Sequence, residues 1–202
     1  SPSKNFAKQL LGSLPFSLTD AQKRVSKEIV QDLKQNKPML RLVQGDVGAG
    51  KTLVAGVAAC HALEEGWQVA LMAPTEILAE QHYLNFKKWF EPLGLNVSWL
   101  SGKQKGKARA AAEQGIKEGT ANLVVGTHAL FQENVGFAKL GLVIIDEQHR
   151  FGVDQRLALR NKGANNMTPH QLVMTATPIP RTLAMSAYGD LDTSVIDELP
   201  PG

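Results

Sequence analysis

The sequence predicts an α/β domain in which a parallel β-sheet is covered by helices on both faces. Short apolar runs alternate with stretches of helical length along the 202 residues, which is typical of β-α-β units. Polar clusters follow three of the apolar runs directly, at 45–52, 146–149 and 175–177. Because parallel strands bring their carboxyl ends to one edge, where such folds bind ligands, we expect these clusters to meet.

The first cluster is a glycine-rich loop between a predicted strand and a predicted helix. It fits the pattern G-x-x-x-x-G-K-[ST] of a phosphate-binding loop. Glycines permit positive φ angles and present backbone N–H groups to phosphate oxygens. Lys51 can reach the β- and γ-phosphates, and the Thr52 hydroxyl can bind Mg²⁺. The candidate nucleotide-binding residues are Gly45, Asp46, Val47, Gly48, Ala49, Gly50, Lys51 and Thr52.

The helices are predicted from caps and from the spacing of apolar residues. Thr19 or Asp20 is a good N-cap, and the apolar residues that follow recur at helical intervals. A Pro-Thr-Glu sequence begins a later helix, which Pro92 and Gly94 limit. The predicted helices span about 19–35, 53–65, 75–91 and 108–117.

The strands are predicted from short apolar runs bounded by turn residues. The run at 142–145 is apolar at every position, as expected for a strand buried on both faces. The run at 193–196 is a candidate edge strand. The predicted strands are 39–43, 68–73, 96–100, 123–126, 142–145, 171–174 and 193–196.

The chain predicts one main domain at 14–198. Residues 1–13 are expected to be a linker or the end of an upstream region, and 199–202 the start of a further linker. Composition adds little: the net charge of +3 is compatible with nucleic acid but does not establish it. The single cysteine, Cys60, excludes an internal disulfide framework and is expected to be buried. No membrane-spanning run or leader pattern is visible, so a reducing, cytoplasmic setting is expected.

An acidic pair follows the buried strand at 142–145. Asp146 is placed to hold Mg²⁺, and Glu147 can accept a hydrogen bond from the water that attacks a γ-phosphate. An Asp-Glu pair alone is more simply a solvated turn. Its position after a buried strand, downstream of a phosphate-binding loop, favours nucleotide hydrolysis instead.

These motifs, in this order, resemble those of superfamily 2 helicases. The segments that carry the resemblance are 45–52, 73–82, 146–149 and 175–178. The strings at 146–153 and 174–184 are similar to those of bacterial branch-migration helicases. Gln148 favours that group over the transcription-repair coupling translocases, which usually have Glu there.

The resemblance implies a RecA-like, ATP- and Mg²⁺-dependent motor lobe with a role for each motif. Phe16 and Gln22 would bind adenine, although Gln22 taken alone is more simply a solvated helix residue. The catalytic candidates are Lys51, Asp146, Glu147, Gln148 and His149. Of these, Gln148 and His149 would couple phosphate loss to movement, together with Thr175, Ala176 and Thr177. The residues expected to face the DNA backbone are Thr75, Glu76, Gly126, Thr127 and His128. The lysines that could add attraction, or merely be solvated, are Lys103, Lys105 and Lys107.

The resemblance also implies partners: branched or forked DNA, a second RecA-like lobe with an arginine finger, and an N-terminal wedge domain. Two alternatives remain within ATP-binding proteins, a duplex-DNA translocase lobe and a module that binds ATP without hydrolysing it. A small-molecule kinase is a third, although no Arg-rich lid is visible. Turnover and its dependence on DNA distinguish these classes.

Overall fold

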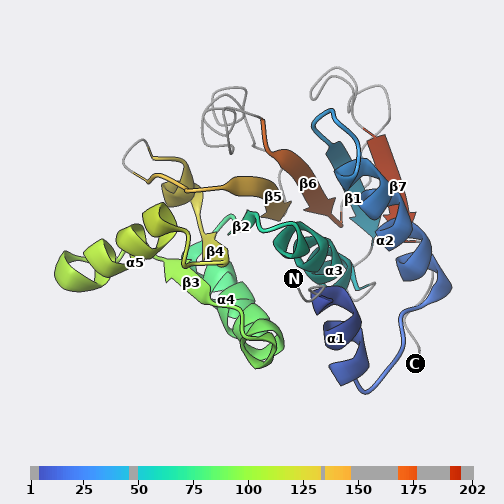
Figure 1. Ribbon diagram of the computed structural model, residues 1–202, viewed down its shortest axis with the longest axis horizontal. Helices are drawn as coiled ribbons and strands as arrows, with labels where there is room; N and C mark the ends of the chain where they lie inside the picture. The colour runs from blue at the N-terminus through green and yellow to red at the C-terminus, as the bar shows by residue number, and fades with distance from the viewer. Residues whose placement is uncertain (1–4, 46–49, 133–134, 147–167, 177–191, 197–202) are drawn as a thin grey trace.

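The computed structural model has one parallel β-sheet with helices on both faces (Figure 1). It describes residues 5–45, 50–132, 135–146, 168–176 and 192–196. Within these ranges the strands are β1 (Leu40–Gly45), β2 (Gln68–Met72), β3 (Val97–Leu100), β4 (Leu123–Gly126), β5 (Leu140–Asp146), β6 (His170–Thr175) and β7 (Asp192–Ile196). Their order is β3-β4-β2-β5-β6-β1-β7, and every pairing is parallel, as predicted.

The helices lie close to the predicted ranges. They are α1 (Phe6–Ser13), α2 (Asp20–Leu33), α3 (Lys51–Glu64), α4 (Glu76–Phe90) and α5 (Gly106–Glu118), with 3₁₀ turns η1 (Glu91–Leu93) and η2 (His128–Phe131). Helix α2 is capped by Thr19, one of the two predicted caps. The segment expected to be a linker or the end of an upstream region holds α1, whose Leu10 is fully buried.

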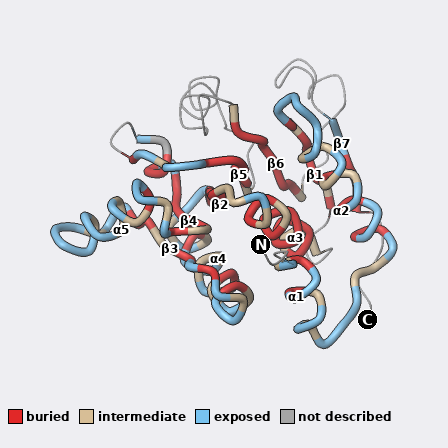
Figure 2. The backbone as a smooth tube through the Cα atoms, in the orientation of Figure 1, coloured by how far each residue is buried: buried red, intermediate tan, exposed pale blue. Residues whose placement is uncertain are grey.

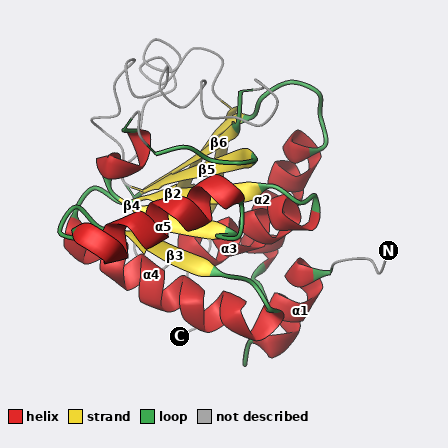
Figure 3. Cartoon of the chain, turned by 60° about the vertical axis from the view of Figure 1, so that its left-hand side comes forward, coloured by secondary structure: helices red, strands yellow, loops and turns green. Residues whose placement is uncertain are grey.

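The sheet separates two apolar layers. Along β5, Leu142 and Ile144 point into one layer, while Val143 and Ile145 point into the other, because successive side chains of a strand alternate between faces. Helices α1 to α4 cover the first face, and α5 with η2 covers the second (Figure 3). The strands and α3 are largely buried, whereas most of α5 is exposed (Figure 2).

Helix α3 is apolar around most of its circumference because it is enclosed on several sides. It packs against β1 and β2 and also against α1 and α2. Its small residues permit this close packing: a Cβ on Gly56 would lie 3.2 Å from the Trp89 ring. Cys60 on the same helix is fully buried, as predicted, and burial raises the pKa of its thiol. A helix of this kind is held in place by tertiary packing.

The edge strand β7 is fastened by a buried arginine. Arg41 of β1 donates to the Ser194 hydroxyl of β7 at 2.7 Å and to Asp32 of α2 at 2.6 Å. Gly45 also pairs with Ile196, which explains why β1 extends two residues beyond its predicted end. The candidate edge strand at 193–196 is therefore confirmed, with β1 and α2 as its anchors.

Strand β6 begins at a buried histidine. His170 accepts a hydrogen bond at Nδ1 from the backbone N–H of Met39 at 2.8 Å, and its ring lies 5.7 Å from that of Trp67. Burial lowers the pKa of His170 below its ordinary value of 6.5, while the charge of Asp32 acts in the opposite direction. Protonation of Nδ1 would also remove the hydrogen bond from Met39.

We expect His170 to make the protein less stable in weak acid. Because its pKa is lowered on folding, the unfolded chain binds a proton near pH 6.5 that the folded chain does not. The free energy of unfolding therefore falls as pH decreases below about 6.5, until the folded pKa is reached. Urea unfolding at pH 7.5 and pH 5.5 measures this loss. In His170→Asn, whose amide oxygen can still accept from Met39, the loss should be smaller, whereas the exposed-residue control His128→Asn should match the parent. An equal loss in His170→Asn would contradict the assignment.

Candidate functional site

The two ends of the phosphate-binding loop are held together. Gly45 ends β1, Gly50 is the N-cap of α3 with φ of 83°, and Lys51 is the first helical residue. Lys51 Nζ donates to the Gly45 carbonyl oxygen at 2.7 Å. The predicted residues Asp46, Val47, Gly48 and Ala49 lie outside the described residues. The N-terminus of α3, where backbone N–H groups and the helix dipole favour an anion, thus faces the end of the strand.

Gln22 lies against this loop. Its Nε2 donates to the Gly50 carbonyl oxygen at 3.4 Å, and its side chain completes a capping box with Thr19. Only 6% of Gln22 is exposed, so the alternative of a solvated helix residue is wrong. Phe16, in the segment before α2, exposes 54% of its surface and is accessible to a planar ring.

The carboxyl ends of β5, β6 and β1 are neighbours at one edge of the sheet. Asp146 at the end of β5 pairs in register with Met174 of β6, and Thr175 of β6 pairs with Gln44 of β1. The described members of the three polar clusters therefore meet at this edge, as predicted. Thr175 is buried and Ala176 follows it, whereas Glu147, Gln148, His149 and Thr177 lie outside the described residues.

A histidine that had no predicted role contacts Asp146. His82 Nε2–H of α4 donates to Asp146 Oδ2 at 2.7 Å, and both side chains are largely buried, with 12% and 14% exposed. The segment 73–82 was singled out for its family resemblance, but nothing in the sequence indicates which of its side chains reaches β5. The contact joins residues 64 positions apart.

The second half of the same edge is formed by the ends of β3, β4 and β2. Thr75 caps α4, accepting from Leu78 N–H at 3.2 Å, and is exposed. His128 is also exposed, whereas Thr127 is 4% exposed. A Cβ on Gly126 would lie 2.8 Å from the Leu100 carbonyl oxygen, so only glycine fits where β4 passes β3. Of the expected DNA-facing residues, Thr75 and His128 thus present side chains to solvent.

Glu76 connects these strand ends. Its Oε1 accepts from Gly102 N–H at 3.0 Å and from the Thr127 hydroxyl at 3.4 Å, and its Oε2 accepts from the Ser101 hydroxyl at 3.2 Å. A carboxylate would repel a DNA phosphate, but here its hydrogen bonds fix the two neighbouring loops. The geometry therefore makes Glu76 a residue that positions the surface around it.

The basic loop at 101–107 has a defined shape. Gln104 accepts from Ser101 N–H at 3.1 Å and donates to the Trp99 carbonyl oxygen at 3.1 Å, and Arg109 donates to the Ser101 carbonyl oxygen at 3.0 Å. Three lysines on this loop and the start of α5 are exposed: Lys103, Lys105 and Lys107. Both alternatives for them, solvation and attraction of a phosphate backbone, remain compatible with this position.

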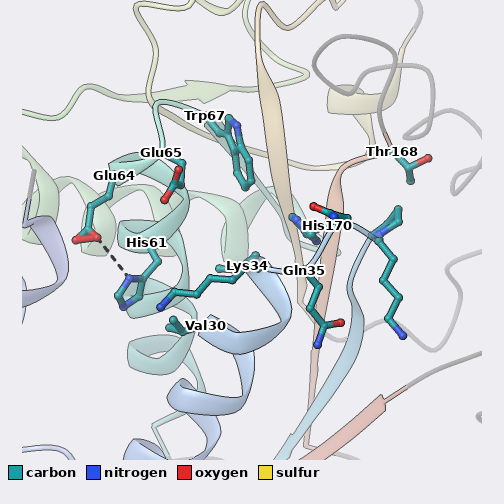
Figure 4. A pocket seen from close by; sticks show the side chains of 13 residues that line it. Val30, Lys34, Gln35, His61, Glu64, Glu65, Trp67, Thr168 and His170 are labelled. Atoms are coloured by element: carbon teal, nitrogen blue, oxygen red, sulfur yellow. Dashed lines mark ion pairs between the residues drawn. The ribbon is translucent and has the colours of Figure 1, made fainter.

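A hollow of about 560 Å³ lies at the opposite edge of the sheet (Figure 4). Its walls come from residues at the amino ends of β1, β2 and β6 and the carboxyl ends of α2 and α3, including Trp67, His61 and His170. His61 pairs with Glu64 at 3.4 Å. The hollow is thus at the edge away from Gly45 and Asp146, and it is not the nucleotide site.

The chain belongs to the DEAD/DEAH box helicase family, whose family model matches residues 19–186. Among curated relatives, the ATP-dependent DNA helicase RecG of Haemophilus influenzae is 66% identical over 195 residues, and RecG of Aquifex aeolicus is 53% identical over 199. These matches cover 96% and 98% of this chain, but only 28% and 25% of those proteins.

Solved structures agree with this class. The structure of RecG bound to a three-way DNA junction is similar to this chain with a TM-score of 0.84 and 48% identity, over 97% of this chain and 26% of that one. A Sulfolobus tokodaii structure, described as that of a hypothetical ATP-dependent RNA helicase, has a TM-score of 0.68 at 20% identity, which supports the fold alone. The RecA-like fold is therefore confirmed. In the described part of the chain, no helix is long and apolar enough to span a membrane.

We expect Gly50→Ala to weaken ATP binding about tenfold, because a side chain would strain the left-handed backbone and displace Gln22. Isothermal titration with ATP measures the affinity. Gly66→Ala is a matched control: Gly66 also has positive φ, but nothing lies within 4 Å of its added Cβ. ATP affinity in Gly50→Ala equal to that in Gly66→Ala would contradict a role for Gly50 and its contact with Gln22 in ATP binding.

Proposed function

We propose that this chain is the first motor lobe of an ATP-dependent DNA helicase that remodels branched DNA, such as forks and Holliday junctions. The observation that carries the proposal is the single sheet edge. One half of it holds Asp146 and the start of the phosphate-binding loop, at the ends of two strands with β6 between them, and the other half holds the surface around the exposed Thr75 and His128, called here the Thr75–His128 surface. Identity of 66% to RecG supports the same assignment. The alternatives are a duplex-DNA translocase lobe and an ATP-binding module without turnover.

The nucleotide half would supply the groups that hydrolysis requires. Backbone N–H groups of 46–51 and the Lys51 ammonium would bind the phosphates, and Gln22 with Phe16 would bind adenine. Thr52 in the first turn of α3 and Asp146 at the end of β5 would hold Mg²⁺, and hydroxyl and carboxylate oxygens suit that cation. When bound, the cation neutralises charge on the β- and γ-phosphates. Glu147 would orient the attacking water, and the coupling residues would be Gln148, His149, Thr175, Ala176 and Thr177.

The DNA half offers contacts that do not read bases. The exposed N-terminal end of α4 at Thr75, the backbone at 126–127 and the His128 ring would bind phosphates, and the three loop lysines would add attraction. This pattern supports binding without sequence preference. The relative solved with a three-way junction supports branched DNA as the substrate class.

The chain spans about a quarter of the length of the curated relatives that it matches. We infer that a second RecA-like lobe supplies an arginine finger, a group worth about 10³–10⁵ in rate in related phosphoryl-transfer sites. An N-terminal wedge domain would grip the junction. The cytoplasm is the proposed location.

We expect Lys51→Ala to weaken ATP binding by the chain about tenfold to a hundredfold, because a charge-assisted hydrogen bond to phosphate contributes about 1.5–3 kcal/mol. Fluorescence titration with a labelled ATP measures this. Lys117→Ala on α5 is the control for lost charge. Residues 1–202 by themselves should bind ATP with negligible turnover, with or without forked DNA, because the arginine finger is proposed to come from a second lobe. Lys51-dependent turnover stimulated by forks would contradict this half-site assignment.

In the intact protein, Glu147→Gln should reduce ATP turnover by about 10² or more while ATP binding is retained, because a group that acts on the attacking water contributes about 10²–10⁴. A coupled phosphate-release assay with forked, duplex and single-stranded DNA measures turnover. Stimulation by forks above duplex would support a branched-DNA helicase over a duplex translocase. Turnover unchanged by Glu147→Gln would remove this residue from its role.

A further inference from the structure

The hydrogen bond between His82 and Asp146 crosses the two halves of the sheet edge. Asp146 ends β5 in the nucleotide half, whereas His82 belongs to α4, whose first turn forms part of the DNA half. The His82 ring also lies 6.3 Å from the Phe86 ring, within the largely apolar layer under α4. A largely buried carboxylate in such surroundings is strongly oriented by a hydrogen-bond donor 2.7 Å away.

Helix α4 can act as a rigid connection because its inner face is anchored. Ala79, Phe86 and Phe90 are fully buried against the sheet. Six residues separate Glu76 from His82, which corresponds to about 9 Å along the axis of a helix. A shift of the first turn therefore moves the imidazole with it, since the core does not deform continuously.

The first turn of α4 is itself tied to the surface proposed to bind DNA. Glu76 accepts hydrogen bonds from Gly102 and Ser101 after β3 and from Thr127 after β4. Thr75 at the N-cap and His128 beyond Thr127 are exposed on that surface. A phosphate backbone bound there would act on the same helix that carries His82.

We propose that His82 is a positioning residue that orients the Asp146 carboxylate for Mg²⁺ and, through α4, makes Mg²⁺-nucleotide binding depend on DNA. The inference rests on the proposed function, which gives Asp146 and the Thr75–His128 surface their ligands. Residues that hold a metal-binding carboxylate contribute about 10- to 100-fold in metal affinity. Coupling between two binding sites is reciprocal, so nucleotide must change DNA affinity by the same factor.

The test uses the intact protein that carries this chain, with three variants. His82→Leu removes the donor, and His82→Gln keeps an amide N–H at similar reach. His61→Leu removes a histidine from α3 at the opposite edge, where it pairs with Glu64. Two quantities are measured without turnover: the Mg²⁺ concentration for half-maximal binding of a non-hydrolysable ATP analogue, and the ratio of fork affinities with and without that analogue.

We expect His82→Leu to raise the required Mg²⁺ concentration about tenfold and to bring the fork-affinity ratio close to one. His82→Gln should recover both quantities, and His61→Leu should equal the parent. This rescue distinguishes orientation of Asp146 from general loss of packing, which thermal unfolding monitors separately.

Three results would overturn the inference. A parental Mg²⁺ requirement in His82→Leu would remove the orienting role, and a raised requirement with an unchanged fork-affinity ratio would remove the connection through α4. In both cases the proposed function stands, because the parent still couples nucleotide to DNA. If the parent protein binds forks with the same affinity with and without the analogue, the proposed function is contradicted. The proposed coupling through α4 is then contradicted as well.

Discussion

Parallel pairing of β5, β6 and β1 is the constraint on which the rest of the structure depends. In a parallel sheet every strand ends at the same edge, and neighbouring strands place their ends about 5 Å apart. The register therefore decides that Asp146 lies beside β6 and that β6 delivers Thr175 beside β1. Without this pairing, a phosphate-binding loop and a carboxylate about 95 residues apart in the sequence would have no common ligand.

The same edge has a second half, formed by β3, β4 and β2, and helix α4 joins the two. At one end of α4, Glu76 accepts hydrogen bonds from two loops, and about 1.7 turns later His82 reaches Asp146. Anions are favoured in both halves, through helix N-termini and basic side chains. A motor in which nucleotide binding changes DNA affinity requires a stiff element between the two binding sites. Helix α4 lies where such an element is needed.

Much of the fold could be predicted because its signals are local. Alternating apolar runs and caps located the strands and helices to within a few residues, and the loop at 45–52 was specific in spacing and context. Helix lengths and strand ends were less predictable. Strand β1 extends to Gly45 because it pairs with β7, and Gln22 is buried because α2 packs beside Gly50, and neither partner is near in sequence.

The sequence by itself determined which chemical groups are present and at which strand ends they occur: the loop around Lys51, the carboxylate of Asp146 and the polar segment at 73–82. Spacing along the chain is sufficient for this, since turn and cap preferences act over a few residues. Only the tertiary structure decided which side chains meet. His82 and Asp146 are 64 positions apart, and Glu76 and Thr127 are 51 apart. Such contacts depend on how helix α4 lies across the sheet, a result of packing in both apolar layers that no local pattern records.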